Sequence, residues 1–365
     1  MMPLPARILN LPPYAPVEPL DVLSARWGRP VDSLVKLDAN ENPYGPAPRV
    51  RQALAELPWV NIYPDPESRA LRAALADFTG VPAEFLLAGA GADELIDLLL
   101  RVLLEPGDRA ALCSPTFGMY AFGARLNAGQ ELDIPRRADF SLDLPALQAV
   151  CAQQRPKVLF LANPNNPDGQ LLGPEEIETL LALPTLVVLD EAYIEFSHSP
   201  SLGAARSCIQ QVPQRENLIV LRTFSKWAGL AGLRVGYGAF PSWLLPALWK
   251  AKQPYNVNIA ASAAALASLE ERALLGERVG QICAERERLR QALSAFPGLE
   301  PLPSAANFIL CRVSAQPAAE LHQALLERGI LVRRYAAPRL QNYLRISVGR
   351  PQDSRALLDA LEELR

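Results

Sequence analysis

The sequence predicts an α/β protein: a three-layer α/β/α core around a mostly parallel sheet, with a smaller α+β domain attached. Between residues 85 and 250, short hydrophobic runs alternate with helical patterns, which is typical of βαβ units. After residue 250, a long polar helix precedes a shorter succession of strands and helices. We therefore expect an N-terminal arm over 1–44, a large domain over 45–255 and a small domain over 256–365. The arm is expected to pack with the small domain, because so short and turn-rich a segment forms no core alone.

Four hydrophobic runs carry the prediction of the large sheet. Each is nearly continuous and rich in leucine or β-branched residues, as expected for parallel strands that are buried on both faces. The runs are FLLA (85–88), KVLFLA (157–162), TLVVLD (185–190) and NLIVLR (217–222). Small or polar loops follow all four runs, and helical patterns follow the first two.

Three further strand runs and three helices make up the predicted small domain. A long polar helix over 276–296 comes first, and a helix ends the chain. The strand runs are NFILCRV (307–313), ILVRRYA (330–336) and YLRISVG (343–349).

Composition narrows the function classes. Half of the 365 residues are hydrophobic, 21% are charged and the net charge is −3, which is typical of a globular protein and argues against nucleic-acid partners. The longest small-apolar run, over 259–269, is too short to span a membrane. We therefore expect a cytoplasmic protein.

Cysteine and histidine usage argues against metal sites. The five cysteines are scattered and form no CxxC pair, and the two histidines, His198 and His322, lie far apart. This pattern predicts no disulfide framework, no zinc site and no histidine-based triad. An enzyme built from this chain must therefore move protons with other side chains.

Residues that follow the four large-sheet strands are expected to share one site, because ligands of open α/β sheets bind beyond the carboxyl ends of the strands. After the first strand, the segment 89–94 (GAGADE) opens a helix, and free backbone N–H groups at a helix start bind phosphate. The segment lacks the third glycine of a dinucleotide fingerprint. A capped helix start without a ligand is the alternative.

Asp190 ends the third strand, where its carboxylate is partly withdrawn from water and needs a cation or hydrogen bonds. A protonated pyridine nitrogen would be a fitting partner, and a cap or turn role is the alternative. Tyr193 lies three residues further on, and Asn166 follows a neighbouring strand. Both could hydrogen-bond a phenolic oxygen on the same ring.

Lys226 follows the fourth strand, among small residues, in a chain with only five lysines. Such a lysine loses its proton more readily than a solvated one and can attack a carbonyl to form a Schiff base. Ser225 and Arg234 flank it and would bind a phosphate. A solvated surface lysine is the alternative, but a phosphate site, ring partners and a nucleophile at four strand ends together argue against it.

Nine segments along nearly the whole chain resemble the fold-type I pyridoxal-5′-phosphate-dependent aminotransferases, and most closely the histidinol-phosphate aminotransferases. DEAY, together with SK eight residues before an arginine, indicates the cofactor family, while ANENPYGP, YPDP and GADE indicate the subgroup. The segments are KLDANENPYGP (36–46), YPDP (63–66), GAGADE (89–94), SPTFGMY (114–120), NPNNPDG (163–169), DEAYIEF (190–196), RTFSKWAGLAGLR (222–234), NFIL (307–310) and YLRISVG (343–349).

This resemblance implies roles for the matching residues. Lys226 would be the Schiff-base lysine and proton shuttle, Asp190 would hold the pyridinium nitrogen, and Asn166 and Tyr193 would bind the ring hydroxyl. The other implied cofactor contacts come from the backbone of Ala92 and Asp93, from Phe117 on the ring face, from Ser225 and Arg234 at the phosphate, and from Tyr63 of the partner subunit. The active unit would be a homodimer, in which the N-terminal arm also contacts the partner subunit.

For the substrate, the resemblance implies that Arg345 binds an α-carboxylate and that Arg333 and Tyr14 contact a distal phosphate. Tyr63 and Asn166 would also line the substrate site. Arginine suits both anions because its planar fork makes paired hydrogen bonds. The implied reaction interconverts L-histidinol phosphate plus 2-oxoglutarate and imidazole-acetol phosphate plus L-glutamate, in histidine biosynthesis.

Three other functions stay open. An aromatic amino-acid aminotransferase uses a similar pocket, and a decarboxylase of a phosphorylated amino acid such as threonine phosphate shares the fold and cofactor. A ligand-sensing aminotransferase-like module is the non-enzymatic alternative. It is disfavoured because the family-like pattern begins near residue 8 and because the net charge is negative.

Three positions depart from the family's usual pattern. Asp168 stands at a turn position where threonine is usual, so we expect little effect on the chemistry. Phe117 stands where many relatives have tyrosine, which keeps stacking but removes a hydroxyl. Trp227 and Ala228 reverse the usual order of a small residue and an aromatic one, and we expect this swap close to the cofactor.

Overall fold

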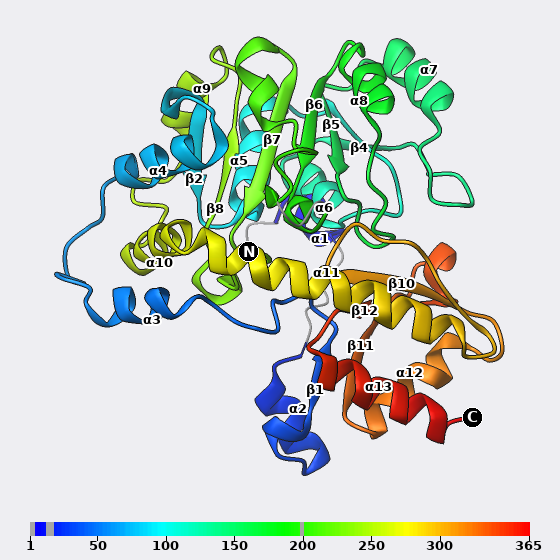
Figure 1. Ribbon diagram of the computed structural model, residues 1–365. Coiled ribbons are helices and arrows are strands. Elements are labelled where there is room, and N and C mark those ends of the chain that lie inside the picture. Colours follow the sequence, from blue (N-terminus) through cyan, green and yellow to red (C-terminus); the bar gives the residue numbers. More distant parts are fainter. Residues whose placement is uncertain (1–3, 12–17, 198–200) are drawn as a thin grey trace.

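The computed structural model describes residues 4–11, 18–197 and 201–365. Within these ranges, two sheets organise the chain (Figure 1). The large sheet has the strand order β2-β8-β7-β6-β5-β3-β4 and the small sheet β1-β11-β12-β10-β9. The large-sheet strands are β2 (Leu86–Gly89), β3 (Arg109–Leu112), β4 (Gln130–Asp133), β5 (Val158–Ala162), β6 (Leu186–Asp190), β7 (Leu218–Thr223) and β8 (Gly236–Ala239).

The large sheet is parallel except at β8, which pairs antiparallel with both β2 and β7. The four strands expected from the sequence are confirmed as β2, β5, β6 and β7. Their side chains alternate between two cores, so that in β5 Leu159 and Leu161 face one core and Val158 and Phe160 face the other. Burial on both faces explains why these strands read as continuous hydrophobic runs.

Helices cover both faces of the large sheet, which confirms the three-layer α/β/α prediction. In α5, Asp93 and Glu94 lie in the first turn, where they complement the helix dipole. One face is covered by α5 (Ala92–Leu103), α6 (Met119–Leu126) and α9 (Leu245–Ala251). The other is covered by α3 (Pro48–Ala55), α4 (Arg69–Thr79), α7 (Leu144–Gln154), α8 (Pro174–Leu181), α10 (Ile259–Glu270) and the first half of α11 (Arg272–Ser294).

The small sheet is covered on one face by α12 (Ala318–Glu327) and α13 (Pro351–Glu363). Strand β1 comes from the N-terminal arm and pairs in parallel with β11, which ties the arm to this sheet. The arm also contains α1 (Ala6–Leu9) and α2 (Leu20–Trp27). The small-sheet strands are β1 (Val35–Leu37), β9 (Leu299–Pro301), β10 (Phe308–Val313), β11 (Ile330–Arg334) and β12 (Tyr343–Ser347).

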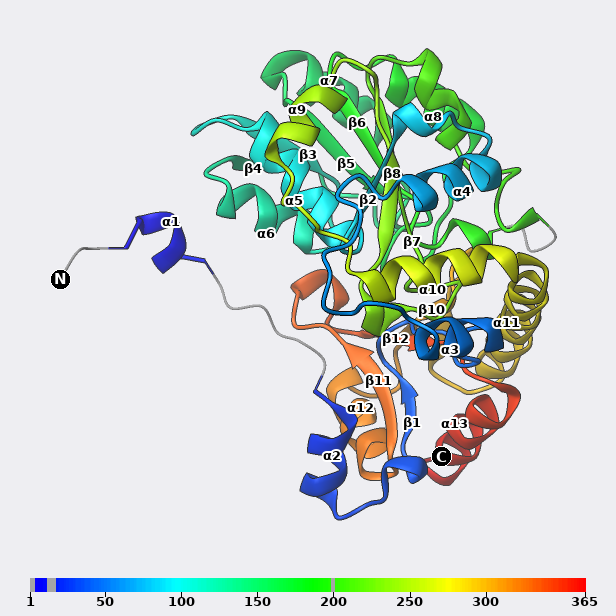
Figure 2. The ribbon, with the colours of Figure 1, turned by 90° about the vertical axis from the view of Figure 1, so that its left-hand side faces the viewer.

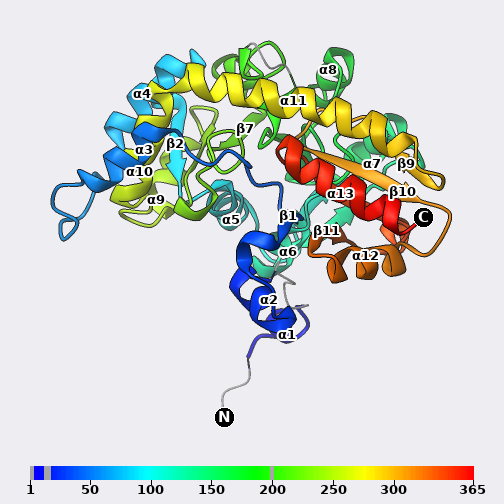
Figure 3. The same cartoon turned by 60° about the horizontal axis from the view of Figure 1, so that its bottom comes forward.

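Helix α11 joins the two parts of the molecule. Leu275 and Val279 belong to the large-sheet core, whereas Leu289 and Leu293 pack under the small sheet. Figures 2 and 3 show the helix running along both units. The domain boundaries stay a prediction. Helix α10 lies beyond residue 255, in the predicted small domain, but it packs on α3 and α4 of the predicted large domain.

Candidate active site

A pocket opens at the carboxyl ends of β2, β5, β6 and β7. These four strands run in the same direction, so their final residues meet at one edge of the sheet, as predicted. The pocket is lined by Ala92, Asp93, Phe117, Tyr120, Ala162, Asn166, Asp190, Ala192, Tyr193, Thr223, Ser225, Lys226, Ala231 and Arg234.

Asp190 lies at the floor of this pocket and is only 5% exposed. Tyr120 Oη donates a hydrogen bond to its Oδ2 at 2.7 Å, and the Ala192 N–H donates to Oδ1 at 3.1 Å. Burial nevertheless raises the pKa of Asp190 to about 6. No cation pairs with this carboxylate among the described residues, so the pocket offers a buried negative charge to a ligand.

Lys226 comes from the loop that follows β7 and is partly buried. Its Nζ donates to the carbonyl oxygen of Ala39 at 3.3 Å and lies 5.8 Å from the centre of the Tyr193 ring. Burial, reinforced by the charge of Arg345, lowers the pKa of Lys226 from 10.5 to about 8. A substantial fraction of this amine is therefore neutral near physiological pH and able to act as a nucleophile or base.

Tyr193 and Asn166 reach the pocket from the loops after β6 and β5. Asn40 Nδ2 donates to Tyr193 Oη at 3.1 Å, and burial raises the pKa of this phenol. Asn166 Oδ1 accepts a 2.9 Å hydrogen bond from Arg345 Nη1, which joins the pocket to the small sheet.

The start of α5 forms the opposite end of the pocket. Arg234 Nη2 pairs with Asp93 Oδ2 at 2.8 Å across this helix terminus. A side chain at Gly91, whose φ is +84°, would bring a Cβ to 2.7 Å from Arg234 Nη2. Glycine therefore leaves room for the Arg234 guanidinium at this helix start, and Ser225 lines the same pocket.

These residues fit pyridoxal phosphate. The buried carboxylate of Asp190 suits a pyridinium nitrogen, and the amine of Lys226 suits an aldehyde. A helix N-terminus with a hydroxyl and a guanidinium suits a phosphate. Phe117 lines the pocket with its ring perpendicular to that of Tyr120, 5.5 Å between centres.

The small sheet adds arginines beside the pocket. Arg345 of β12 lies directly opposite Arg333 of β11. Arg345 is 7% exposed, and its Nη2 donates to the Asp38 carbonyl oxygen at 2.7 Å. No carboxylate of the described ranges forms an ion pair with it, so a buried guanidinium faces the pocket edge without a counter-ion.

Of the predicted residues that the structure describes, Tyr63, Arg333 and Arg345 do not line this pocket, and the two arginines lie beside it. Tyr63 lies in the loop between α3 and α4, is 77% exposed and stacks on Tyr255 with ring centres 4.4 Å apart. Within one chain it does not line the pocket, and its place in a partner's site stays a prediction. Tyr14 lies outside the described residues.

The Trp227 side chain does not line the pocket, although the residue directly follows Lys226. Its side chain is fully buried and packs between Phe78 and Phe224, with ring centres 5.5 Å from each. It does not line the pocket, because it points from the lysine loop into the helix layer on the other side. Asp168 is a turn residue as predicted, and it is fully buried, accepting a 2.9 Å hydrogen bond from the Gln170 N–H.

Sequence reasoning missed Tyr120, Asn40 and Thr223. Tyr120 stands in the segment SPTFGMY, but only the packing of α6 against β3 and β4 brings its hydroxyl to Asp190. Asn40 has a φ of +55° and reaches Tyr193 from the N-terminal arm. The one available signal for Tyr120 and Asn40 was their place in motifs of the resembled family.

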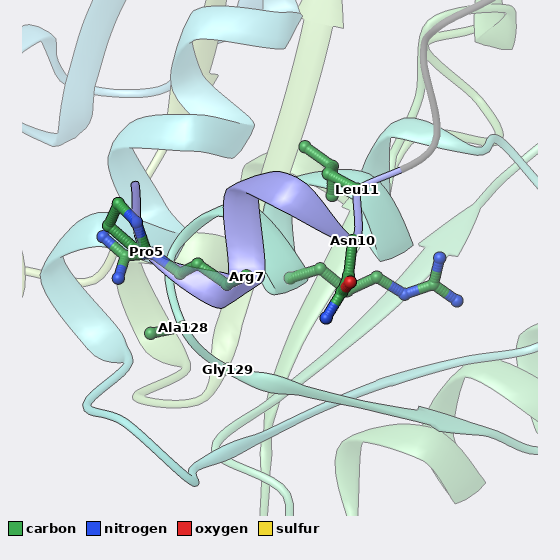
Figure 4. Close-up of a pocket in the computed structure, with 7 residues that line it drawn as sticks. Pro5, Arg7, Asn10, Leu11, Ala128 and Gly129 are labelled. Carbon is green, nitrogen blue, oxygen red and sulfur yellow. The ribbon is translucent and has the colours of Figure 1, made fainter. Parts of the chain in front are cut away.

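Three other pockets within the described ranges are lined by none of the predicted site residues. A hollow between α1 and the end of α6 is lined by Arg7, Asn10 and Arg125 among others (Figure 4). No cluster of potential metal ligands occurs within the described ranges, which exclude His198. Among the helices of these ranges, none has the length and hydropathy to cross a membrane.

The fold and the pocket define a pyridoxal-phosphate-dependent enzyme. The chain belongs to the aminotransferase class I and II family, whose model matches residues 32–361.

Individual relatives resemble the chain along almost its whole length. The chloroplastic histidinol-phosphate aminotransferase of Nicotiana plumbaginifolia is 50% identical over 97% of this chain and 85% of its own. That of Roseiflexus castenholzii is 49% identical over 98% of this chain and 96% of its own. The crystal structure of histidinol-phosphate aminotransferase from Sinorhizobium meliloti, in complex with pyridoxal-5′-phosphate, has a TM-score of 0.87 at 29% identity, covering 99% of this chain and 98% of that one.

Proposed function

We propose that this enzyme transfers the amino group between L-histidinol phosphate and 2-oxoglutarate, giving imidazole-acetol phosphate and L-glutamate, as a step of histidine biosynthesis. One observation carries the proposal: a partly buried lysine and a buried carboxylate line one pocket, and a buried arginine without a counter-ion hydrogen-bonds Asn166 at its edge. Relatives that are 49–50% identical over nearly the whole chain are named histidinol-phosphate aminotransferases.

Pyridoxal phosphate, when bound, supplies an aldehyde for the substrate amine and a ring that withdraws electrons from the reacting carbon. Asp190 would hold the ring nitrogen and its proton. The remaining contacts would come from Asn166 and Tyr193 at the ring oxygen, from Phe117 on the ring face, and from Ala92, Asp93, Ser225 and Arg234 at the phosphate.

Lys226 carries the proton transfer in this proposal. As a neutral amine, its Nζ would accept a proton from the substrate's α-carbon and would deliver a proton to the carbon that was the cofactor's aldehyde carbon, so that the amino group stays with the cofactor. The lowered pKa suits this task, since a lysine of ordinary pKa 10.5 is almost fully protonated at neutral pH. No histidine is needed for either transfer.

Arg345 binds the substrate's anionic group in this proposal. A buried guanidinium is costly without a counter-ion, and an oxyanion of the substrate would provide one. Arg333, directly opposite in the sheet, supports a second anionic contact. Arg345 would bind the α-carboxylate of glutamate. Arg333 and Tyr14 would bind the phosphate of histidinol phosphate.

We further propose a homodimer in which Tyr63 completes the partner's site. The loop that carries it exposes an apolar group, which suits burial between two copies. The group consists of Trp59, Val60, Ile62, Tyr63 and the neighbouring Tyr255. Light scattering tests this proposal: twice the chain's 39.8 kDa is expected, and a monomer that is fully active would contradict it.

The cytoplasmic location stays a proposal. It is supported by the lack of a membrane-spanning helix among those described, whereas the Nicotiana relatives are named chloroplastic. Cell fractionation with an antibody to the chain would test it.

Turnover with competing amines tests the substrate assignment. We expect the largest kcat/KM for L-histidinol phosphate with 2-oxoglutarate, measured as glutamate formed. A larger value for L-phenylalanine would move the assignment to aromatic amino acids. Carbon dioxide release from threonine phosphate would indicate a decarboxylase.

A further inference from the structure

Tyr335, one residue beyond the end of β11, has a buried hydroxyl that no contact explains. Its Oη has no hydrogen-bond partner among the described residues. Buried polar groups are normally satisfied in native structures, so an unpaired hydroxyl beside an active site points to a missing ligand atom.

The strand register places this hydroxyl with the arginines of the small sheet. Arg333 and Arg345 are directly opposite, and Tyr335 follows Arg333 by two residues, which puts it on the same face. The centre of its ring lies 6.0 Å from the Arg333 guanidinium carbon and 5.9 Å from that of Arg345. Like charges directly opposite each other are unfavourable, and an anion between them would remove that penalty.

A second donor in the same place is also unpaired. Arg345 Nε is buried without a partner among the described residues, while the other two nitrogens bind Asn166 and the Asp38 carbonyl. One face of the sheet therefore offers a positive charge, an unpaired N–H and an unpaired O–H close together. This donor set fits an oxyanion.

We propose that Tyr335 is a substrate-binding residue that donates a hydrogen bond to the substrate oxyanion bound beside Arg333 and Arg345, which is a phosphate monoester or a carboxylate. The inference rests on the proposed function and adds a residue to its recognition site. Burial raises the pKa of Tyr335, although Arg345 and Arg333 oppose the shift, so the hydroxyl stays protonated and able to donate at neutral pH.

Tyr335→Phe in the holoenzyme tests this role, because it removes the hydroxyl and keeps the ring. We expect the KM of L-histidinol phosphate to rise about tenfold, as for a lost hydrogen bond to a charged group, with kcat changed less than about twofold. Tyr343→Phe is the matched control. Tyr343 lies in β12 of the same sheet as Arg333 and Arg345, and its ring packs edge-on against Phe140. The KM of this control variant should match that of the unmodified enzyme.

The KM of glutamate is measured in parallel. A rise for histidinol phosphate alone assigns the hydroxyl to the phosphate ester, a rise for glutamate alone assigns it to the α-carboxylate, and a rise for both assigns it to a shared oxyanion site. Unchanged KM values for both substrates, or an equal rise in Tyr343→Phe, would overturn the proposal. If histidinol phosphate is not a substrate of the unmodified enzyme, the proposed function fails, and the glutamate measurement still decides the role of Tyr335.

Tyr335→His is the second variant, for the case that the phenylalanine variant does not fold. Histidine keeps an aromatic ring with an N–H donor, so a KM closer to that of the unmodified enzyme supports donation. A KM raised about tenfold in a histidine variant that binds the cofactor normally would contradict it.

Discussion

The two sheets approach the active site differently: the large sheet presents an edge, and the small sheet presents a face. Asp190 ends β6 and Lys226 follows β7, so the reactive groups sit at strand termini. Arg333 and Arg345 instead project from the middle of paired strands. The other face of the small sheet is a hydrophobic core under α12 and α13.

In the proposed function, the chemical step takes place at one sheet and substrate recognition at the other. In the proposed mechanism, the large-sheet edge holds the groups that bind the cofactor and move protons, whereas the small-sheet face holds the groups that select an anion. Changes at the edge should therefore alter cofactor binding or kcat, and changes on the face should alter KM. The following predictions test that division.

Lys226→Ala should have the largest effect, because it removes both nucleophile and base. We expect turnover to fall by at least about 10⁴-fold, measured as glutamate formed. Lys157→Ala is the control, since that lysine is partly exposed and pairs with Asp108 away from the pocket. Near-normal turnover in Lys226→Ala would end the proposed mechanism.

Arg345→Lys should lower kcat/KM about 100-fold while leaving the cofactor's visible spectrum unchanged. Lysine keeps the charge but loses the planar fork that joins Asn166 to the substrate anion. Arg312→Lys, exposed on β10 and paired with Glu300, serves as the control. A loss of cofactor without a change in substrate KM would break the division between edge and face.

Tyr120→Phe should weaken cofactor binding about tenfold, measured by titration of the cofactor-free protein at pH 7. The tyrosine's hydrogen bond lowers the pKa of Asp190, so its loss raises that pKa and leaves less carboxylate for the ring nitrogen. The acid limb of binding should accordingly move to higher pH. Tyr237→Phe removes a buried hydroxyl that has no partner among the described residues and lies away from the pocket, so binding should stay unchanged.

The smallest expected effect is a shift in the pH dependence of cofactor uptake, caused by the charge of Arg345 in the small sheet on Lys226 at the large sheet. Covalent cofactor uptake by the cofactor-free protein needs neutral Lys226, so its rate should rise with pH to a plateau, with a midpoint near 8. Arg345 helps to lower this pKa, and Arg345→Gln should therefore move the midpoint upward. Stopped-flow absorbance measures the profile. A midpoint near 10.5 in the unmodified protein would contradict the assigned environment.

The sequence predicts the large-sheet edge well because strands buried on both faces form hydrophobic runs with polar residues after them. β8 was missed because its sequence, GYGA, is half glycine. Gly236 is required there, since a Cβ would lie 2.8 Å from the Ala92 nitrogen. β3 and β4 were also missed, since β3 (RAAL) is half alanine and β4 (QELD), at the edge of the sheet, is mostly polar.

The small-sheet face was predictable only through the family resemblance. Which side chains share a face depends on the pairing of β11 with β12, which a single sequence does not specify. Tyr120 and Asn40 were missed for a related reason: each reaches its partner across a long stretch of chain. The direction of the Trp227 side chain, away from its neighbour Lys226, was not predicted either, because it depends on packing against Phe78 of α4.

The central claim is that the two sheets together carry out half of a transamination on L-histidinol phosphate. The most direct test is the visible spectrum of the purified, cofactor-loaded protein after that amine is added without any keto acid. The account predicts that the yellow aldehyde form converts to the pyridoxamine form, with one equivalent of imidazole-acetol phosphate released per site. An unchanged spectrum with histidinol phosphate, together with conversion by L-phenylalanine, would contradict it.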